Sequence, residues 1–133
     1  MRQAQTLNEA QFRRVLHFCH SRRHPLRETT IFMVSFYAGL RAKEIASLKL
    51  GDVFDETGAV REQFILGADQ SKGRQRRTVY LSQRLRKALA NYAKSKCLRE
   101  LNRPLFESQK GGHFSANTMC QLFLDIYKAC GLK

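Results

Sequence analysis

Arg41 is the residue whose setting most clearly suggests chemistry. It follows a long apolar segment and a Gly-Leu break, and Glu44 lies three residues beyond it. The planar guanidinium of an arginine can hold two oxygens of one phosphate group, and a nearby carboxylate can keep it in place. An arginine in this position can equally be solvated, or form an ion pair with Glu44 on the next helical turn. The residues by themselves leave both interpretations open.

A basic segment at residues 71–77 supplies the second candidate group, Lys72. A lysine at the tip of a hairpin can reach a DNA groove and protonate a departing oxygen, although many basic hairpin loops are only solvated surfaces. Further cations lie beside the two candidates and would contact neighbouring phosphates: Lys43, Arg74, Arg76 and Arg77. Such contacts add affinity for a nucleic acid without reading its sequence.

The charge balance points to a polyanionic partner. The 133-residue chain has 24 Lys and Arg against 11 Asp and Glu, which gives a formal net charge of +13. A protein with this much positive charge most often binds a DNA or RNA backbone. A ribosome-associated role and binding to a membrane surface are the alternatives. No apolar stretch approaches the length of a membrane span, and residues 1–5 begin no signal-peptide apolar region. The sequence therefore predicts a cytoplasmic, nucleic-acid-binding domain.

The cysteines and histidines do not form a metal-ligand pattern. Four scattered cysteines include no Cys-x-x-Cys pair, so they are interpreted as small buried hydrophobes. His17, Cys19, His20 and His24 do cluster, but no carboxylate or second cysteine joins them, and Cys19 continues an apolar stripe. We expect neither a metal site nor a disulfide framework.

The elements that must position Arg41 and Lys72 follow from the apolar spacing. Thr6 and Glu9 form a possible capping box for a first helix that ends near residues 22–24, before Pro25. The predicted helices after it span residues 26–40, 42–47, 83–96 (capped by Ser82) and a last one that Ser115 begins, with Gly131 at its end. The predicted strands are at residues 53–54, 63–66 and 78–81. The fold class is α+β, mainly α, with helices around a small three-stranded antiparallel sheet.

Several motifs together resemble the tyrosine recombinase, or phage integrase, family. GLRAKEI at residues 39–45, with SL at 47–48 and DV at 52–53, is similar to the family's first-arginine box. SKGRQRRTVYL at 71–81 is similar to its β-hairpin lysine motif, PLF at 104–106 fits the stretch after it, and TLNEAQ at 6–11 resembles the start of its catalytic domain. The resemblance spans essentially the whole chain.

The resemblance implies a role for each candidate residue. Arg41 would stabilise the charge that builds on the scissile phosphate, Glu44 would position the site, and Lys72 would protonate the 5′ oxygen as the strand breaks. The family reaction uses no metal or nucleotide cofactor, because a tyrosine attacks and forms a 3′-phosphotyrosyl bond. The implied partners are duplex DNA and, in the family, other recombinase protomers on the DNA, with no membrane.

The sequence also departs from the family pattern. The family's His-x-x-Arg box and nucleophilic tyrosine follow the last helix predicted here, and the two His-x-x-Arg strings at residues 20–23 and 24–27 precede Arg41. The four tyrosines, including Tyr80 and Tyr127, are interpreted as core residues rather than nucleophiles.

We therefore expect residues 1–133 to be a partial catalytic domain that binds DNA without cleaving it. It would lack the His-x-x-Arg and Tyr segment and the N-terminal core-binding domain. A non-catalytic DNA-binding or regulatory protein with this fold, or a basic RNA-binding module, are the alternatives.

Overall fold

The computed structural model describes residues 7–70, 75–96, 98 and 100–132. Within them the helices are α1 (Glu9–His20), α2 (Pro25–Ala38), α3 (Ala42–Ala46), α4 (Leu50–Val53), α5 (Gln83–Ala93) and α6 (Ala116–Ala129), and the strands are β1 (Gln63–Leu66) and β2 (Arg77–Tyr80). The mainly helical α+β fold is confirmed.

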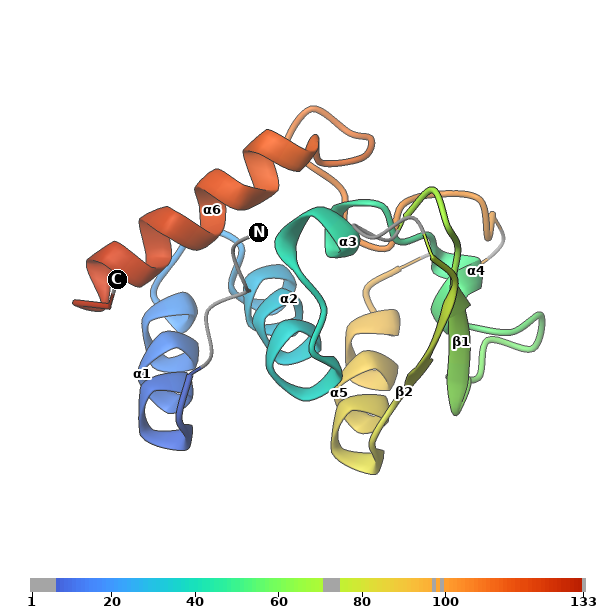
Figure 1. The fold of residues 1–133 in the computed structure, drawn as a ribbon, viewed down its shortest axis with the longest axis horizontal. Helices are drawn as coiled ribbons and strands as arrows, with labels where there is room; N and C mark the ends of the chain where they lie inside the picture. The colour runs from blue at the N-terminus through green and yellow to red at the C-terminus, as the bar shows by residue number, and fades with distance from the viewer. Residues whose placement is uncertain (1–6, 71–74, 97, 99, 133) are drawn as a thin grey trace.

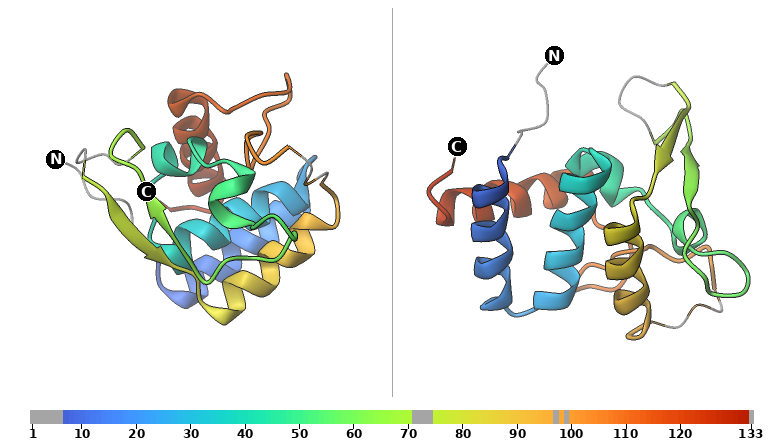
Figure 2. Two further views of the ribbon diagram at one scale, coloured as in Figure 1. Left: turned by 90° about the vertical axis from the view of Figure 1, so that its right-hand side faces the viewer. Right: turned by 90° about the horizontal axis from the view of Figure 1, so that it is seen from below.

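Three helices form one layer of the molecule. In the right-hand view of Figure 2, α1, α2 and α5 stand side by side, and α6 crosses α1 and α2. Figure 1 shows the same layer end-on, with α3 close to α6 and with the two strands beyond α5. Contacts between α3 and α6, between α1 and α2, and between α2 and α5 join these elements. α3 also contacts α2, so the short helix that follows Arg41 is held against two longer ones.

The core lies where the apolar faces of α2, α5 and α6 meet. Phe32 of α2 contacts Phe123 and Tyr127 of α6, with ring centroids 4.4 and 5.7 Å apart. Tyr92 of α5 is buried, and its hydroxyl donates to the carbonyl of Leu105 at 2.9 Å. The apolar spacing of these helices is thus the spacing of residues that bury side chains together.

The first helix begins later than the sequence suggested. Its N-cap is Asn8, whose side chain accepts the Gln11 N–H at 2.8 Å, while the Gln11 side chain accepts the Asn8 N–H at 3.0 Å. This reciprocal capping box replaces the expected box of Thr6 and Glu9, and Thr6 lies outside the described residues. The helix ends at His20, before the predicted residues 22–24, and Pro25 occupies the first turn of α2.

The helix starts that were predicted at Ser82 and Ser115 are confirmed. The Ser82 side chain accepts the Leu85 N–H at 3.2 Å, and the Ser115 side chain accepts the Thr118 N–H at 3.0 Å. Gly131, with φ +76°, follows the last turn of α6 in the left-handed conformation that favours glycine.

The prediction of a three-stranded sheet is wrong, because the described residues form a sheet of two strands. β1 and β2 are antiparallel, with Gln63 opposite Tyr80 and Leu66 opposite Arg77. The expected strand at residues 53–54 is instead the end of α4 followed by a single bridge from Phe54 to Val60. Leu50, Val53 and Phe54 are all buried, and this i, i+3, i+4 spacing suits one helical turn better than an alternating strand.

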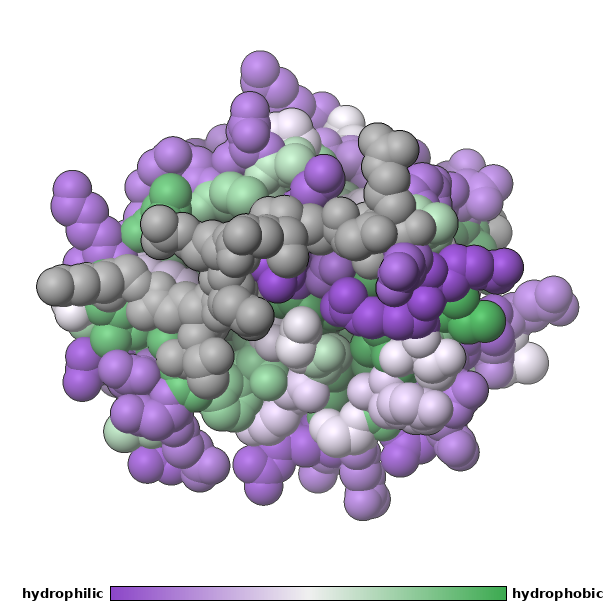
Figure 3. Space-filling view, in the orientation of Figure 1, coloured by the Kyte–Doolittle hydropathy of each residue, from purple (hydrophilic) through white to green (hydrophobic). Residues whose placement is uncertain are grey.

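The sheet has one buried and one exposed face. Phe64, Leu66 and Val79 point into the core, whereas Tyr80 is 69% exposed. The interpretation of Tyr80 as a core residue is therefore wrong, because it alternates with buried Val79 along β2. On the face shown in Figure 3, hydrophilic side chains surround the rim, and hydrophobic side chains are visible between them.

Candidate functional site

Arg41 is placed by a sharp change in chain direction. α2 ends at Gly39, which has φ +70°, and buried Leu40 anchors the connection to α3. A side chain at Gly39 would meet no atom within 4 Å, so the positive φ itself is the reason for glycine there. Arg41 is then the N-cap residue of α3, with an extended backbone and a partly exposed side chain.

Glu44 joins the arginine box to the hairpin. Its Oε1 accepts the backbone N–H of Arg41 at 3.0 Å, and the residue is fully buried. The same carboxylate accepts two hydrogen bonds from Arg77 of β2, from Nη1 to Oε2 at 3.1 Å and from Nη2 to Oε1 at 3.0 Å. Glu44 therefore connects two segments that are far apart in the sequence.

The remaining candidate residues lie around this connection or outside the described part of the chain. Lys43 of α3 and Arg76 just before β2 are exposed. Lys72 and Arg74 lie outside the described residues, so their roles stay predictions. The structure thus brings Arg41, Glu44 and Arg77 together, with Lys43 and Arg76 adjacent to them in sequence.

Sequence reasoning missed the partner of Arg77, which had been predicted to contact a phosphate. Glu44 and Arg77 are 33 positions apart in the sequence, and no periodic pattern over that separation could pair them. A second missed contact joins His113 to the end of α3, where its Nδ1 lies 3.2 Å from the carbonyl oxygen of Ala46. Both contacts hold α3 to distant parts of the chain.

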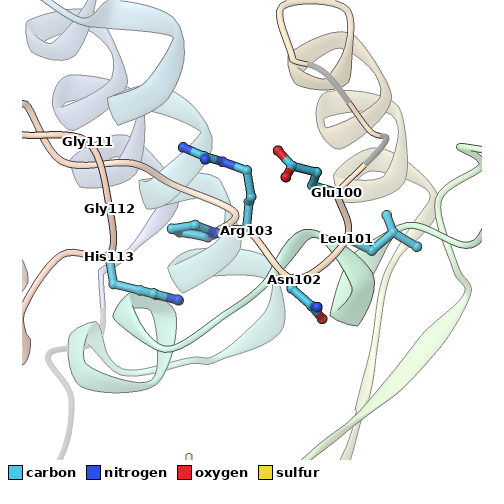
Figure 4. A pocket seen from close by; sticks show the side chains of 8 residues that line it. Glu100, Leu101, Asn102, Arg103, Gly111, Gly112 and His113 are labelled. Carbon is cyan, nitrogen blue, oxygen red and sulfur yellow. The ribbon is translucent and has the colours of Figure 1, made fainter.

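Two pockets lie away from Arg41. One pocket of about 670 Å³ lies between residues 100–104 and 111–113, and Figure 4 shows Arg103 and His113 at its wall. Another, of about 600 Å³, lies between the α1–α2 connection and the first half of α6. None of the described candidate residues lines either of these two pockets.

The tyrosines of the described residues differ in their surroundings. Tyr92 and Tyr127 are buried, and burial raises the pKa of both hydroxyls, that of Tyr127 to about 12. Their interpretation as core residues is confirmed. Tyr37 is half-buried, and its hydroxyl accepts a hydrogen bond from Arg84 at 3.4 Å.

The described residues contain neither a cluster of metal-ligand side chains nor a helix that could span a membrane. Over these residues, no group of three or more His, Cys, Asp and Glu could hold a metal ion. Cys19, from the histidine-rich segment, is buried in the core. Over the same part of the chain, no helix is long and apolar enough to cross a membrane.

Comparison with known proteins identifies the family. The model of the phage integrase family matches residues 5–133, which is nearly the whole chain. The chain belongs to the phage integrase family. This integrase-family chain has no significant match among curated proteins. The resemblance seen in the arginine box and hairpin motifs is thereby confirmed.

Two solved structures share the fold of this integrase-family chain. The crystal structure of XerA recombinase superposes with a TM-score of 0.71 at 24% sequence identity, covering 100% of this chain and 45% of that protein. The Tn1549 transposon integrase (residues 82–397), solved with circular intermediate DNA, gives a TM-score of 0.69 at 16% identity, covering 98% of this chain and 45% of the chain in that structure. The chain therefore spans less than half the length of these two relatives.

Proposed function

We propose that this chain is the DNA-binding part of the catalytic domain of a site-specific tyrosine recombinase. The observation that carries the proposal is the placement of Arg41 at the N-cap of α3, with its backbone fixed by buried Glu44, in a chain of the phage integrase family. The net charge of +13 supports a nucleic-acid ligand. The partner is duplex DNA, together with other recombinase protomers bound to it.

Each candidate residue has a distinct role in this proposal. Arg41 would hold the non-bridging oxygens of the scissile phosphate and stabilise the charge that develops there. Lys72 would protonate the 5′ oxygen, while Lys43, Arg74 and Arg76 would bind flanking phosphates. In the complete reaction a tyrosine forms a 3′-phosphotyrosyl bond that a new strand later reverses, and no metal or nucleotide cofactor takes part.

The polypeptide of residues 1–133 by itself is proposed to bind DNA without cleaving it. Tyr92 and Tyr127 are buried with raised pKa values, which opposes phenolate formation at these two side chains. Tyr80 of β2 is 69% exposed, and the proposal gives it no nucleophilic role. Incubation with labelled duplex DNA should give no denaturant-resistant protein–DNA adduct. An adduct at a mapped tyrosine would overturn this part of the proposal.

The binding site is tested by the salt dependence of affinity for duplex DNA, measured by fluorescence anisotropy. Each phosphate contact contributes about −0.9 to the slope of log K against log salt, so Arg41→Ala and Lys72→Ala should each reduce the slope by about one. Arg23→Ala is the matched control, because it removes the same charge from an exposed residue beyond the other end of α2. Unchanged slopes in both site variants would overturn the assignment, and preference for structured RNA would favour an RNA-binding module.

A further inference from the structure

Arg77 is engaged within the protein rather than directed only at solvent. Its guanidinium and the Glu44 carboxylate form a two-point ion pair of 3.0 and 3.1 Å, and the Glu44 side chain is 0% exposed while that of Arg77 is 43% exposed. Fork-to-fork pairing of this kind fixes the orientation of both side chains as well as their charge. A phosphate that drew Arg77 away would leave a buried carboxylate without this partner, which is costly.

The ion pair also reaches the backbone of Arg41. Glu44 Oε1 accepts both Arg77 Nη2 and the Arg41 N–H, each at 3.0 Å. One oxygen thus connects the strand β2 to the first residue of the α3 turn. Because Glu44 Oε1 fixes the backbone N–H of Arg41, it also fixes the point from which the Arg41 side chain begins.

We propose that Arg77 is a positioning residue, which acts through Glu44 to hold Arg41 in its binding orientation, and is not a phosphate contact. The inference rests on the proposed function, since it assigns Arg77 within that same DNA-binding site. It revises the expectation from sequence that all the hairpin arginines contact phosphates. Arg76, one residue earlier and exposed, keeps the phosphate-contact role.

The charges of the two residues allow the roles to be separated. Glu44→Gln removes a negative charge, so electrostatics alone would strengthen binding to DNA, whereas loss of positioning would weaken it. We expect both Glu44→Gln and Arg77→Ala to weaken duplex DNA binding by about tenfold, as loss of a charge-assisted pair does. Tighter or unchanged binding by Glu44→Gln would overturn the proposal.

The double variant shows whether the two residues act together. If Arg77 acts through Glu44, the combined variant should bind no more weakly than the weaker of the two single variants, since the same connection is lost. If Arg77 instead contacts a phosphate, the two effects would add, which would overturn the proposal. Arg76→Ala combined with Glu44→Gln is the matched control and should show additive effects.

Amide hydrogen exchange, measured without DNA, tests the role of Arg77 independently of whether the protein binds DNA. Under conditions where circular dichroism shows a folded protein, Arg77→Ala should speed exchange of the Arg41 amide by about tenfold, and Arg76→Ala should leave it unchanged. Unchanged exchange in Arg77→Ala would overturn the positioning role even if the protein binds DNA. Absence of DNA binding by the unmodified chain would instead overturn the proposed function, while the exchange result would still decide the role of Arg77.

Discussion

Glu28 in the first turn of α2 accepts a hydrogen bond from Arg22 Nε at 2.5 Å. The Glu28 side chain is only 3% exposed, and Arg27 Nη2 lies 3.5 Å from its other oxygen. The hydrogen bond to Glu28 raises the pKa of Arg22. A carboxylate in the first helical turn also interacts favourably with the helix dipole. The ion pair of Arg22 and Glu28 therefore holds the α1–α2 connection against α2, the helix that precedes Arg41.

Removal of Glu28 should therefore destabilise the protein strongly. Glu28→Ala leaves Arg22 and the largely buried Arg27 without their carboxylate, and should lower the free energy of unfolding by about 3 kcal/mol. The measurement is urea unfolding followed by circular dichroism. Glu9→Ala is the control, because its ion pair with Arg13 is exposed and should contribute less than about 1 kcal/mol. Equal losses in the two variants would contradict this account.

Phe32 is the residue of α2 that should matter most for packing against α6. It is 1% exposed and contacts the rings of Phe123 and Tyr127. Phe32→Ala should lower the free energy of unfolding by about 3–5 kcal/mol, because it leaves a cavity between the helices. Leu124→Ala, on the exposed side of α6, should change it by less than about 0.5 kcal/mol. A small effect of Phe32→Ala in the same unfolding assay would show that this contact is unimportant.

The turn before Arg41 should tolerate only residues that accept a positive φ. Gly39→Ala places a Cβ in the left-handed region at φ +70° without any clash, so its cost of about 1–2 kcal/mol comes from backbone strain alone. Gly39→Asn should cost less, because asparagine visits this conformation more readily. Thermal unfolding of the two variants tests this order, and an alanine variant as stable as the parent would disprove it.

Cys19 and Cys120 should differ sharply in reactivity. Burial, together with nearby Glu28, raises the pKa of the Cys19 thiol to about 12, whereas Cys120 is exposed. Because the thiolate is the reactive form, a raised pKa leaves Cys19 protonated and unreactive at pH 8. Mass spectrometry after treatment with a thiol reagent should find Cys120 modified in the folded protein and Cys19 modified only after unfolding. Rapid labelling of Cys19 in a folded Cys120→Ser variant would contradict its burial.

Glu107 should contribute to the loss of stability in acid. Its hydrogen bond from Arg103 lowers the pKa of the Glu107 carboxyl below that of the unfolded chain. A lowered folded-state pKa means that the contribution is present above the unfolded value of about 4.3 and disappears as pH falls through the folded value. Glu107→Gln should therefore make the acid side of the stability–pH curve less steep, and the effect should be small because the pair is exposed. An unchanged curve would exclude this contribution.

Local features of the structure could be predicted from the sequence. Ser82 and Ser115 cap their helices through residues three positions away, and Gly39 and Gly131 adopt positive φ where a helix ends. These features depend on neighbours within one turn, so the sequence contains the interacting groups side by side. The family motifs around Arg41 have the same local character, and the family match confirms them.

Features that depend on distant neighbours were predicted less well. The sequence showed that Val53 and Phe54 are apolar, but two adjacent apolar residues fit a strand or the end of a helical turn equally, and the helical turn is observed. Tyrosine has a high propensity for strands, so the sequence could place Tyr80 in a strand. Only the pairing of β2 with β1 decides whether Tyr80 lies on the buried or the exposed face of the sheet.

The sequence by itself determined the approximate positions of α1, α2, α3, α5 and α6, the caps at Ser82 and Ser115, and the family whose motifs include Arg41 and Lys72. Only the tertiary structure decided that Arg77 of β2 turns its guanidinium toward Glu44 of α3. The reason is physical: helix and turn signals arise from groups a few residues apart, whereas an ion pair across 33 residues forms only when packing brings the strand against α3 and excludes water from the carboxylate.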